Sequence, residues 1–300
     1  MSIKKSESKG GGKSSGKTNG SQSQFMLMIR RYCRNRMAVV SFFFILLLIL
    51  GAIFADSITP YDYAVQNLSE AFQLPSRTHL MGTDNFGRDM FTRILRGARV
   101  SLFVSVLAVA ISTVAAIILG GIAGYYGGAV DAVIMRIIDI FIAIPSLMLS
   151  MVVSAALGTG LVKTAIALAI ANIGPTARQL RSSVLTMKGS EYVEASRAFG
   201  ANDFHILVQH VIPNCLAPII IQIAMGLGGM IMCISSLSFL GLGVQPPTPE
   251  WGNMVAASQQ YLRTYPHLIL FPGLAVMLTM LAFNLIGDGI RDALDPHMKR

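Results

Sequence analysis

Residues 37–55 read MAVVSFFFILLLILGAIFA, a run of nineteen residues without a charge. A helix needs about 20 such residues, at about 1.5 Å each, to cross the hydrocarbon core of a bilayer. Similar runs recur along the chain, in which 53% of the residues are hydrophobic and only 13% are charged. A soluble protein of this length does not have such a composition. The chain is therefore expected to lie in a membrane.

We expect an all-α polytopic membrane protein with six transmembrane helices, because six segments are apolar enough to span a bilayer. The expected spans are residues 37–58, 101–125, 131–157, 161–177, 213–241 and 266–287. The fourth has a short uncharged run, so Lys163 or Arg178 must lie at a membrane interface. Residues 37–300 then form one membrane domain, preceded by a basic disordered or juxtamembrane tail over residues 1–36.

Positive charge is concentrated before the first span. Residues 1–36 contain nine Lys and Arg and one acidic residue. By the positive-inside rule this tail is cytoplasmic, and an even number of spans returns the C-terminus to the same side. Segment 178–212 is then cytoplasmic, whereas segment 56–99 falls outside although its five arginines oppose that placement. Because the charge belongs to the tail, it does not indicate binding to nucleic acid.

Residues 191–201 read EYVEASRAFGA and form a polar stretch between long apolar runs. A helix that begins near Ser190 places Glu191 and Glu194 in its first turn, where the helix dipole favours negative charge. Gly200 is a suitable residue to end this helix, because glycine readily adopts the left-handed conformation found after helix C-termini. The stretch therefore predicts a short polar helix between two spans.

The spacing around this helix resembles a known signature. Residues 194–196 (EAS), Gly200 and residues 210–213 (HVIP) resemble the cytoplasmic EAA loop of ABC-importer permeases, which docks on an ATP-hydrolysing partner. Ser196 stands where the usual pattern has alanine, and His210 where it has an aliphatic residue. Serine is still small, and the His-x-x-Pro-Asn form is common in the peptide branch, so both departures are compatible with docking.

Five further segments resemble one branch of this family, the C-type permease subunits of dipeptide and oligopeptide importers. They are residues 79–89, 97–102, 238–243, 245–252 and 283–296. Together with the EAA loop they cover most of the chain after the tail. The resemblance implies the type I ABC-importer permease fold, with a cytoplasmic coupling loop over residues 178–212.

The resemblance also implies which molecules this chain works with. The chain would be one permease in a bacterial cytoplasmic (inner) membrane and would form half of the path for di- or oligopeptides. Its implied partners are a second homologous permease, two ABC ATPase subunits and an extracytoplasmic substrate-binding protein. ATP and Mg would bind to the ATPases, and this chain would hold no catalytic residue, metal or cofactor. Nickel chelates, glutathione and antimicrobial peptides are alternative solutes of the same branch.

The candidate coupling residues come from matching this chain to the EAA loop. They are Glu191, Glu194, Ala195, Ser196, Arg197, Phe199, Gly200, Ala201 and Pro213. Among them, Arg197 and Phe199 would offer a charge and an aromatic ring to the ATPase surface. The alternative is an ordinary amphipathic connector between two spans.

Gly120, Gly124 and Gly128 recur at four-residue spacing near the end of the second expected span. This spacing lets a neighbouring helix approach closely, either from another span or from a second subunit. The alternative is that Gly127 and Gly128 simply make the turn into the third span.

Polar residues inside the expected spans are candidates for the substrate path: Asp139, Asn172 and Asn284. A carboxylate inside a membrane is by default a functional hypothesis. The alternative for Asp139 is a structural ion pair with Arg136, one turn earlier. For the two asparagines the alternative is hydrogen bonding between helices.

Two other readings of the sequence are weaker. Residues 11–18 formally match a P-loop, but they lack the preceding strand and following helix that would aim its amides at phosphate. A self-sufficient secondary transporter commonly has internal repeats and paired ionisable residues at the midplane. Six spans with one large polar loop and few buried charges fit half of an ABC importer better.

The segment PPTPEW over residues 246–251 precedes the last expected span. Its prolines predict a stiff outer loop. Trp251 is expected at the membrane interface, where tryptophan is enriched, either as an anchor or in contact with the binding protein.

Overall fold

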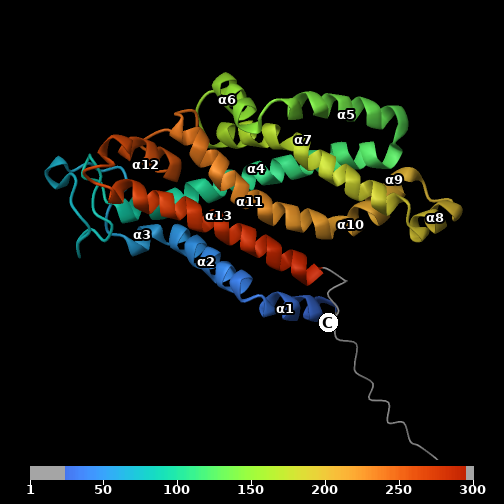
Figure 1. Cartoon of the computed structure of the whole chain (residues 1–300), viewed down its shortest axis with the longest axis horizontal. Helices are drawn as coiled ribbons and strands as arrows, with labels where there is room; N and C mark the ends of the chain where they lie inside the picture. The colour runs from blue at the N-terminus through green and yellow to red at the C-terminus, as the bar shows by residue number, and fades with distance from the viewer. Residues whose placement is uncertain (1–23, 295–300) are drawn as a thin grey trace, which may run out of the picture.

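A computed structural model describes residues 24–294, so the predictions for the preceding tail and its P-loop-like stretch lie outside the described residues. The described part is helical and has no strand, only an isolated bridge between Thr83 and Asp89. Figure 1 shows an elongated bundle in which the longest helices run along the long axis. Helix α8 lies at one end of the bundle and helix α12 at the other.

The longest helices are α2 (Arg36–Ile53), α4 (Met90–Tyr126), α7 (Leu161–Lys188), α11 (Leu216–Phe239) and α13 (His267–Leu294). The shorter ones are α1 (Gln24–Arg34), α3 (Ala55–Ile58), α5 (Gly128–Ala143), α6 (Ser146–Leu157), α8 (Glu191–Ala198), α9 (Asp203–His205), α10 (Ile212–Asn214) and α12 (Trp251–Ser258). Leu68–Glu70 and Gln259–Tyr261 are 3₁₀ turns, and Ile206–Val211 is a π-helix. All the expected spans except the third coincide with a long helix.

By length and composition, α2, α4, α11 and α13 can each cross a membrane. Helices α5 and α6 qualify only as a pair, and they are bent by 90°. The span expected over residues 131–157 is therefore not one straight helix but a bent pair, which can count as a single broken span by length and composition. The break lies at Ile144, which is extended, because Pro145 has no N–H and disfavours the helical conformation of the residue before it. Helix α7 does not qualify, so the described helices account for up to five of the six spans.

Helices α4 and α7 lie side by side, and two of the three spaced glycines lie between them (Figure 1). A Cβ atom at Gly120 would collide with the carbonyl oxygen of Ala177, and one at Gly124 would lie 2.9 Å from Cγ1 of Val184. Gly128 has open space around it and a φ of +54°. Gly128 therefore begins α5 at the turn after α4 and does not pack against another helix of the described chain, and packing against a second subunit stays a prediction.

Trp251 lies in the core at the α12 end of the bundle and is completely buried. Its Nε1 donates a hydrogen bond to the carbonyl oxygen of Ile94 in α4, at 3.0 Å. The ring fills the space left by Gly97, where a Cβ atom would lie 3.0 Å from the Trp251 ring. The expectation that Trp251 lies at the membrane interface is therefore wrong, because a glycine on α4 opens a site for it inside.

Glu250, in the loop before α12, is also completely buried. Its carboxylate accepts hydrogen bonds from the hydroxyl of Ser101 at 3.2 Å, the hydroxyl of Ser235 at 3.3 Å and the backbone N–H of Asn253 at 3.0 Å. These partners belong to α4, α11 and α12, so one carboxylate joins three helices. Burial raises the pKa of Glu250, and the hydrogen bonds it accepts oppose that rise.

The loop between α3 and α4 is folded around buried ion pairs. Asp84 accepts hydrogen bonds from Arg88 at 2.7 Å and lies 3.6 Å from Arg93, and all three side chains are buried. Arg96 pairs with Asp56. Three of the five arginines in segment 56–99 thus have an ion-pair partner in the same segment, and Arg88 and Arg93 share the one carboxylate of Asp84.

Candidate coupling site and polar cleft

The short polar helix predicted from the sequence is α8, and it begins and ends where expected. Glu191 and Glu194 lie in its first turn. At its C-terminus the N–H of Gly200 donates to the carbonyl of Arg197 at 3.0 Å, and the N–H of Ala201 donates to that of Ser196 at 3.2 Å. This is a Schellman motif, and Gly200 makes it with a φ of +83°.

Helix α8 is attached to the bundle on one side and open on the others. Val193 is buried in a cluster with Tyr125, Val184 and Ile206. Beyond the helix, Phe199 is 91% exposed and Phe204 is 69% exposed. Two large aromatic side chains therefore stand clear of the bundle at this end. Such an exposed apolar surface on a polar loop is typical of a binding surface.

The loop after α8 is held by a network that the sequence analysis did not predict. The hydroxyl of Tyr125, in α4, donates to Oδ1 of Asp203 at 2.7 Å and accepts from Nη2 of Arg197 at 3.3 Å. Arg197 and Asp203 also form an ion pair at 3.5 Å. The hydrogen bond with Tyr125 is the main cause that raises the pKa of Arg197. Arg197, expected to face a partner, is thus held by its own chain.

Pro213 lies where the coupling loop returns to the bundle. It is exposed near the start of α10, directly after the π-helical turn Ile206–Val211. Proline has no N–H to donate to the preceding turn, so the regular α-helical hydrogen bonds cannot run through this position. The proline therefore coincides with an irregular junction between the loop and α11.

A cleft of about 290 Å³ lies between α4, α7 and α11, with Arg291 of α13 at its edge. Its polar lining residues are Ser112, Thr113, Asn172, Thr176, Gln179 and Gln222. Asn172 donates a hydrogen bond to the hydroxyl of Thr176 at 3.3 Å. Arg291 donates to the sulfur of Met225 at 3.4 Å. The amides and hydroxyls of this cleft provide both donors and acceptors to a solute.

The other two candidate path residues lie elsewhere. Asp139 pairs with Arg178 of α7, so the pairing expected with Arg136 is wrong. A second ion pair, between Asp131 and Arg181, joins the same two helices. Asn284 lies where α13 packs on α11, and a Cβ atom at Gly228 would lie 3.2 Å from its Oδ1. Of the three residues, only Asn172 lines the cleft.

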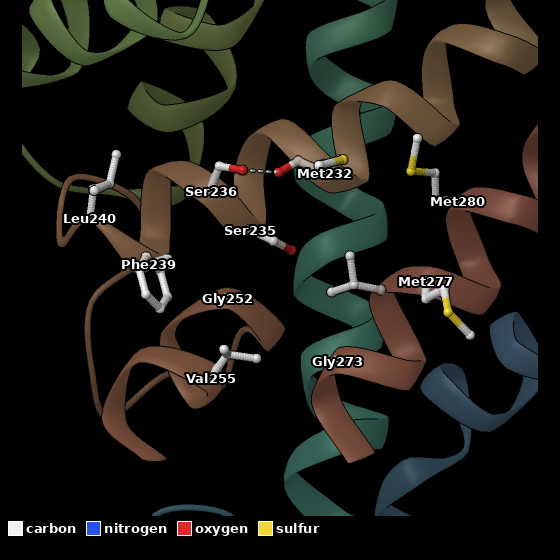
Figure 2. A pocket seen from close by; sticks show the side chains of 11 residues that line it. Met232, Ser235, Ser236, Phe239, Leu240, Gly252, Val255, Gly273, Met277 and Met280 are labelled. Atoms are coloured by element: carbon white, nitrogen blue, oxygen red, sulfur yellow. Dashed lines mark hydrogen bonds between the residues drawn. The ribbon is translucent and has the colours of Figure 1, made fainter. Parts of the chain in front are cut away.

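Figure 2 shows a larger pocket, of about 510 Å³, between α11, α12 and α13. Most of its lining is apolar and includes Met232, Phe239 and Met277. The hydroxyls of its two serines are used within the protein, since Ser236 donates to the carbonyl of Met232 at 2.8 Å and Ser235 donates to Glu250. This pocket therefore offers almost no polar group to a ligand, unlike the cleft beside Asn172.

Among residues 24–294, no group of three or more His, Cys, Asp or Glu side chains could hold a metal ion. The candidate surfaces of the described chain are thus the open face around α8 and the polar cleft. One fits a macromolecular partner, and the other fits a small polar solute.

Comparison with known proteins identifies the family. Residues 116–300 match the family described as binding-protein-dependent transport system inner membrane component, and residues 23–75 match the N-terminal TM domain of oligopeptide transport permease C. The chain is 46% identical over 266 residues to the dipeptide transport system permease protein DppC of Alkalihalophilus pseudofirmus, covering 89% of this chain and 88% of that protein.

Two further relatives are glutathione transport system permease proteins GsiD. The protein of Pectobacterium atrosepticum is 43% identical over 274 residues, which cover 90% of each chain. The protein of Escherichia coli O6:K15:H31 is 44% identical over 274 residues, which cover 90% of this chain and 89% of that one. Such permeases are integral inner-membrane proteins that work with an ATPase and a binding protein. This chain therefore belongs to the family of inner-membrane permeases of binding-protein-dependent ABC importers, in the branch that contains the dipeptide and glutathione systems.

Proposed function

We propose that this chain is one of two homologous permeases in an ATP-driven importer and forms half of the path for di- or oligopeptides. The observation that carries the proposal is the open face of α8, with Phe199 91% exposed at its end, in a chain of this family. The substrate class is supported by the relatives named for dipeptide and glutathione transport, because glutathione is itself a tripeptide.

In this proposal α8 is the coupling helix, and it docks on one of two ABC ATPase subunits. Glu191, Glu194 and Phe199 are exposed and available to the partner, and Gly200 has nothing within 4 Å, so a surface can approach it closely. ATP and Mg bind to the ATPases. This chain contributes neither a catalytic residue nor a cofactor, and acts by moving its helices.

The same proposal places α8 and both termini in the cytoplasm. The opposite end of the bundle, with α12 and the loop between α3 and α4, then faces the binding protein outside. The five arginines of segment 56–99 argue against that placement by number alone. The ion pairs of Arg88, Arg93 and Arg96 do not remove this objection, because the rule counts Lys and Arg and not net charge. The placement rests instead on the nine Lys and Arg of the tail.

The polar cleft is proposed as the part of the peptide path that this subunit contributes. A peptide bond has one donor and one acceptor, and the amides of Asn172, Gln179 and Gln222 can satisfy both whatever the side chains of the peptide are. Arg291 at the edge is suited to a carboxylate. Asp139 is assigned instead to the joint between α5 and α7, and Asn284 to the contact between α13 and α11.

Purification from the native membrane in mild detergent tests the assembly, and reconstitution into liposomes tests transport. We expect a second permease and ATPase subunits to co-purify, and radiolabelled dialanine or glutathione to be taken up with ATP when the binding protein is present. Recovery of this chain alone, without ATPase activity, in a detergent that preserves known complexes would contradict the proposal. A complex that carries nickel chelates but neither peptide would contradict the substrate class only.

A pair of glycine variants tests the coupling role of the loop. Gly200→Asp places a charged side chain at a φ of +83° in the space assigned to the ATPase, so we expect uptake to fall about tenfold or more while the chain still inserts. Gly189→Asp adds the same charge two residues before α8, at a φ of −84° and in open space, and should transport normally. Normal uptake by Gly200→Asp would refute the coupling assignment.

A further inference from the structure

Tyr125, at the end of α4, is only 2% exposed, yet its hydroxyl reaches a polar loop. Its ring packs with Leu180 and Val184 of α7 and with Val193 of α8. The Nζ atom of Lys188 lies 5.5 Å from the ring centre, within range of a cation–π contact. The ring is therefore enclosed by residues from both α7 and α8.

The hydroxyl of Tyr125 joins the two sides of the turn at Gly200. It accepts from Arg197, which precedes the turn, and donates to Asp203, which follows it. Hydrogen bonds to charged groups are stronger than bonds between neutral groups. One buried hydroxyl thus fixes both arms of the loop to the end of α4.

Helix α4 connects this loop to the far end of the bundle. Its 37 residues extend over about 56 Å at 1.5 Å per residue. Towards its other end, the carbonyl of Ile94 accepts from Trp251 and the hydroxyl of Ser101 donates to Glu250. A displacement of the loop that reaches Tyr125 would therefore be carried by α4 to the helices around α12.

We propose that Tyr125 is a positioning residue that ties the coupling loop to α4, so that movement of α8 by a partner moves α4 as well. The part concerning the partner rests on the proposed function. The part concerning the loop does not, because the contacts of Tyr125 lie within this chain. The two parts can be tested separately.

The first test is hydrogen–deuterium exchange of the full chain in detergent. Tyr125→Phe keeps the ring and removes the hydroxyl, so we expect amides in segment 190–203 to exchange roughly tenfold faster, with little change elsewhere. The matched control is Tyr126→Phe, since Tyr126 is adjacent and 47% exposed, with no hydrogen bond from its hydroxyl among the described contacts. Equal exchange in the two variants would overturn the positioning role.

The second test measures peptide taken up per ATP hydrolysed by the complex in liposomes, with dialanine and glutathione as probes. We expect Tyr125→Phe to assemble normally and to lower this ratio about fivefold or more, and Tyr126→Phe to keep it. Asp203→Ala should lower it similarly, and the double variant should add little, because both changes break the same network. An unchanged ratio for Tyr125→Phe would overturn the coupling part. If the unaltered complex takes up neither probe, the proposed function fails, while the exchange experiment still decides whether Tyr125 holds the loop.

Discussion

The end of the bundle around α12 buries an aromatic ring and several charged side chains, whereas the end around α8 leaves Phe199 and two glutamates in the open. At the α12 end Trp251 and Glu250 are completely buried, and Arg93 is 4% exposed. At the α8 end Phe199 is 91% exposed, and Glu194 is exposed as well. The same residue types pack inside the protein at one end and are exposed at the other. The two ends differ in whether this chain itself provides the groups that contact these side chains.

Replacing the buried aromatic residue should have the largest effect on the free energy of unfolding. Trp251→Ala removes a fully buried ring and its hydrogen bond to Ile94, and should cost about 3–5 kcal/mol. Phe199→Ala should cost a few tenths of a kcal/mol, about the range of a surface change. Thermal unfolding in detergent measures both. Similar losses in the two variants would show that the ends do not differ in this way.

A glycine pair should separate close packing from open space. Gly120→Ala forces α4 away from the carbonyl of Ala177, and should destabilise the chain by about 1–3 kcal/mol. Gly229→Ala, in α11, meets nothing within 4 Å, and should stabilise it by about 0.5–1 kcal/mol because glycine weakens a helix. Chemical unfolding in detergent would show opposite signs. A stabilising Gly120→Ala would mean that α4 and α7 are not packed as closely as described.

The exposed aromatic residue should matter for assembly rather than for stability. Phe199→Ala should weaken the binding of the ATPase about tenfold, which corresponds to about 1.4 kcal/mol. Titration of the purified ATPase onto the permease complex in nanodiscs measures this affinity. Leu74→Ala, a change at a 64% exposed residue of the opposite end, serves as the control and should leave the affinity unchanged. Equal affinities in all three proteins would remove Phe199 from the coupling surface.

The smallest effect should come from the buried carboxyl, since its hydrogen bonds partly offset its burial. Burial raises the pKa of Glu250 in the folded chain, so the folded state holds this proton more tightly than the unfolded state does. The stabilisation of the folded state by this proton is fully present below the pKa of the unfolded state and is lost as pH rises through the pKa of the folded state. Glu250→Gln should remove this dependence. As the pH rises from acidic towards neutral, the unfolding temperature of the unaltered protein should therefore fall relative to that of Glu250→Gln.

Local signals predicted the position of the short polar helix α8 well. The acidic residues at 191 and 194 and the glycine at 200 lie within one short segment, and both ends of α8 depend on contacts inside that segment. The break between α5 and α6 also had a local signal, Pro145, but the apolar run across it favoured one continuous span. Composition measures how apolar a segment is and does not report where its axis turns.

Contacts between distant segments were not predictable in the same way. Asp139 has Arg136 one turn away, yet it pairs with Arg178, 39 positions along the chain. Tyr125 is 78 positions from Asp203, and nothing near either residue indicates the other. Phe204 was within reach of the sequence argument, since it is an aromatic residue in a polar loop, as Phe199 is.

The sequence by itself determined that the chain is helical and lies in a membrane. It also determined the positions of most helices along the chain and the end of a short polar helix at Gly200. These properties depend on hydropathy and on hydrogen bonds between residues a few positions apart. Only the tertiary structure decided that Trp251 is buried, that Asn172 lines a cleft while Asn284 does not, and that the hydroxyl of Tyr125 is hydrogen-bonded to Arg197 and Asp203. Burial and pairing depend on which helices meet, and helices meet through side chains that are far apart in the chain.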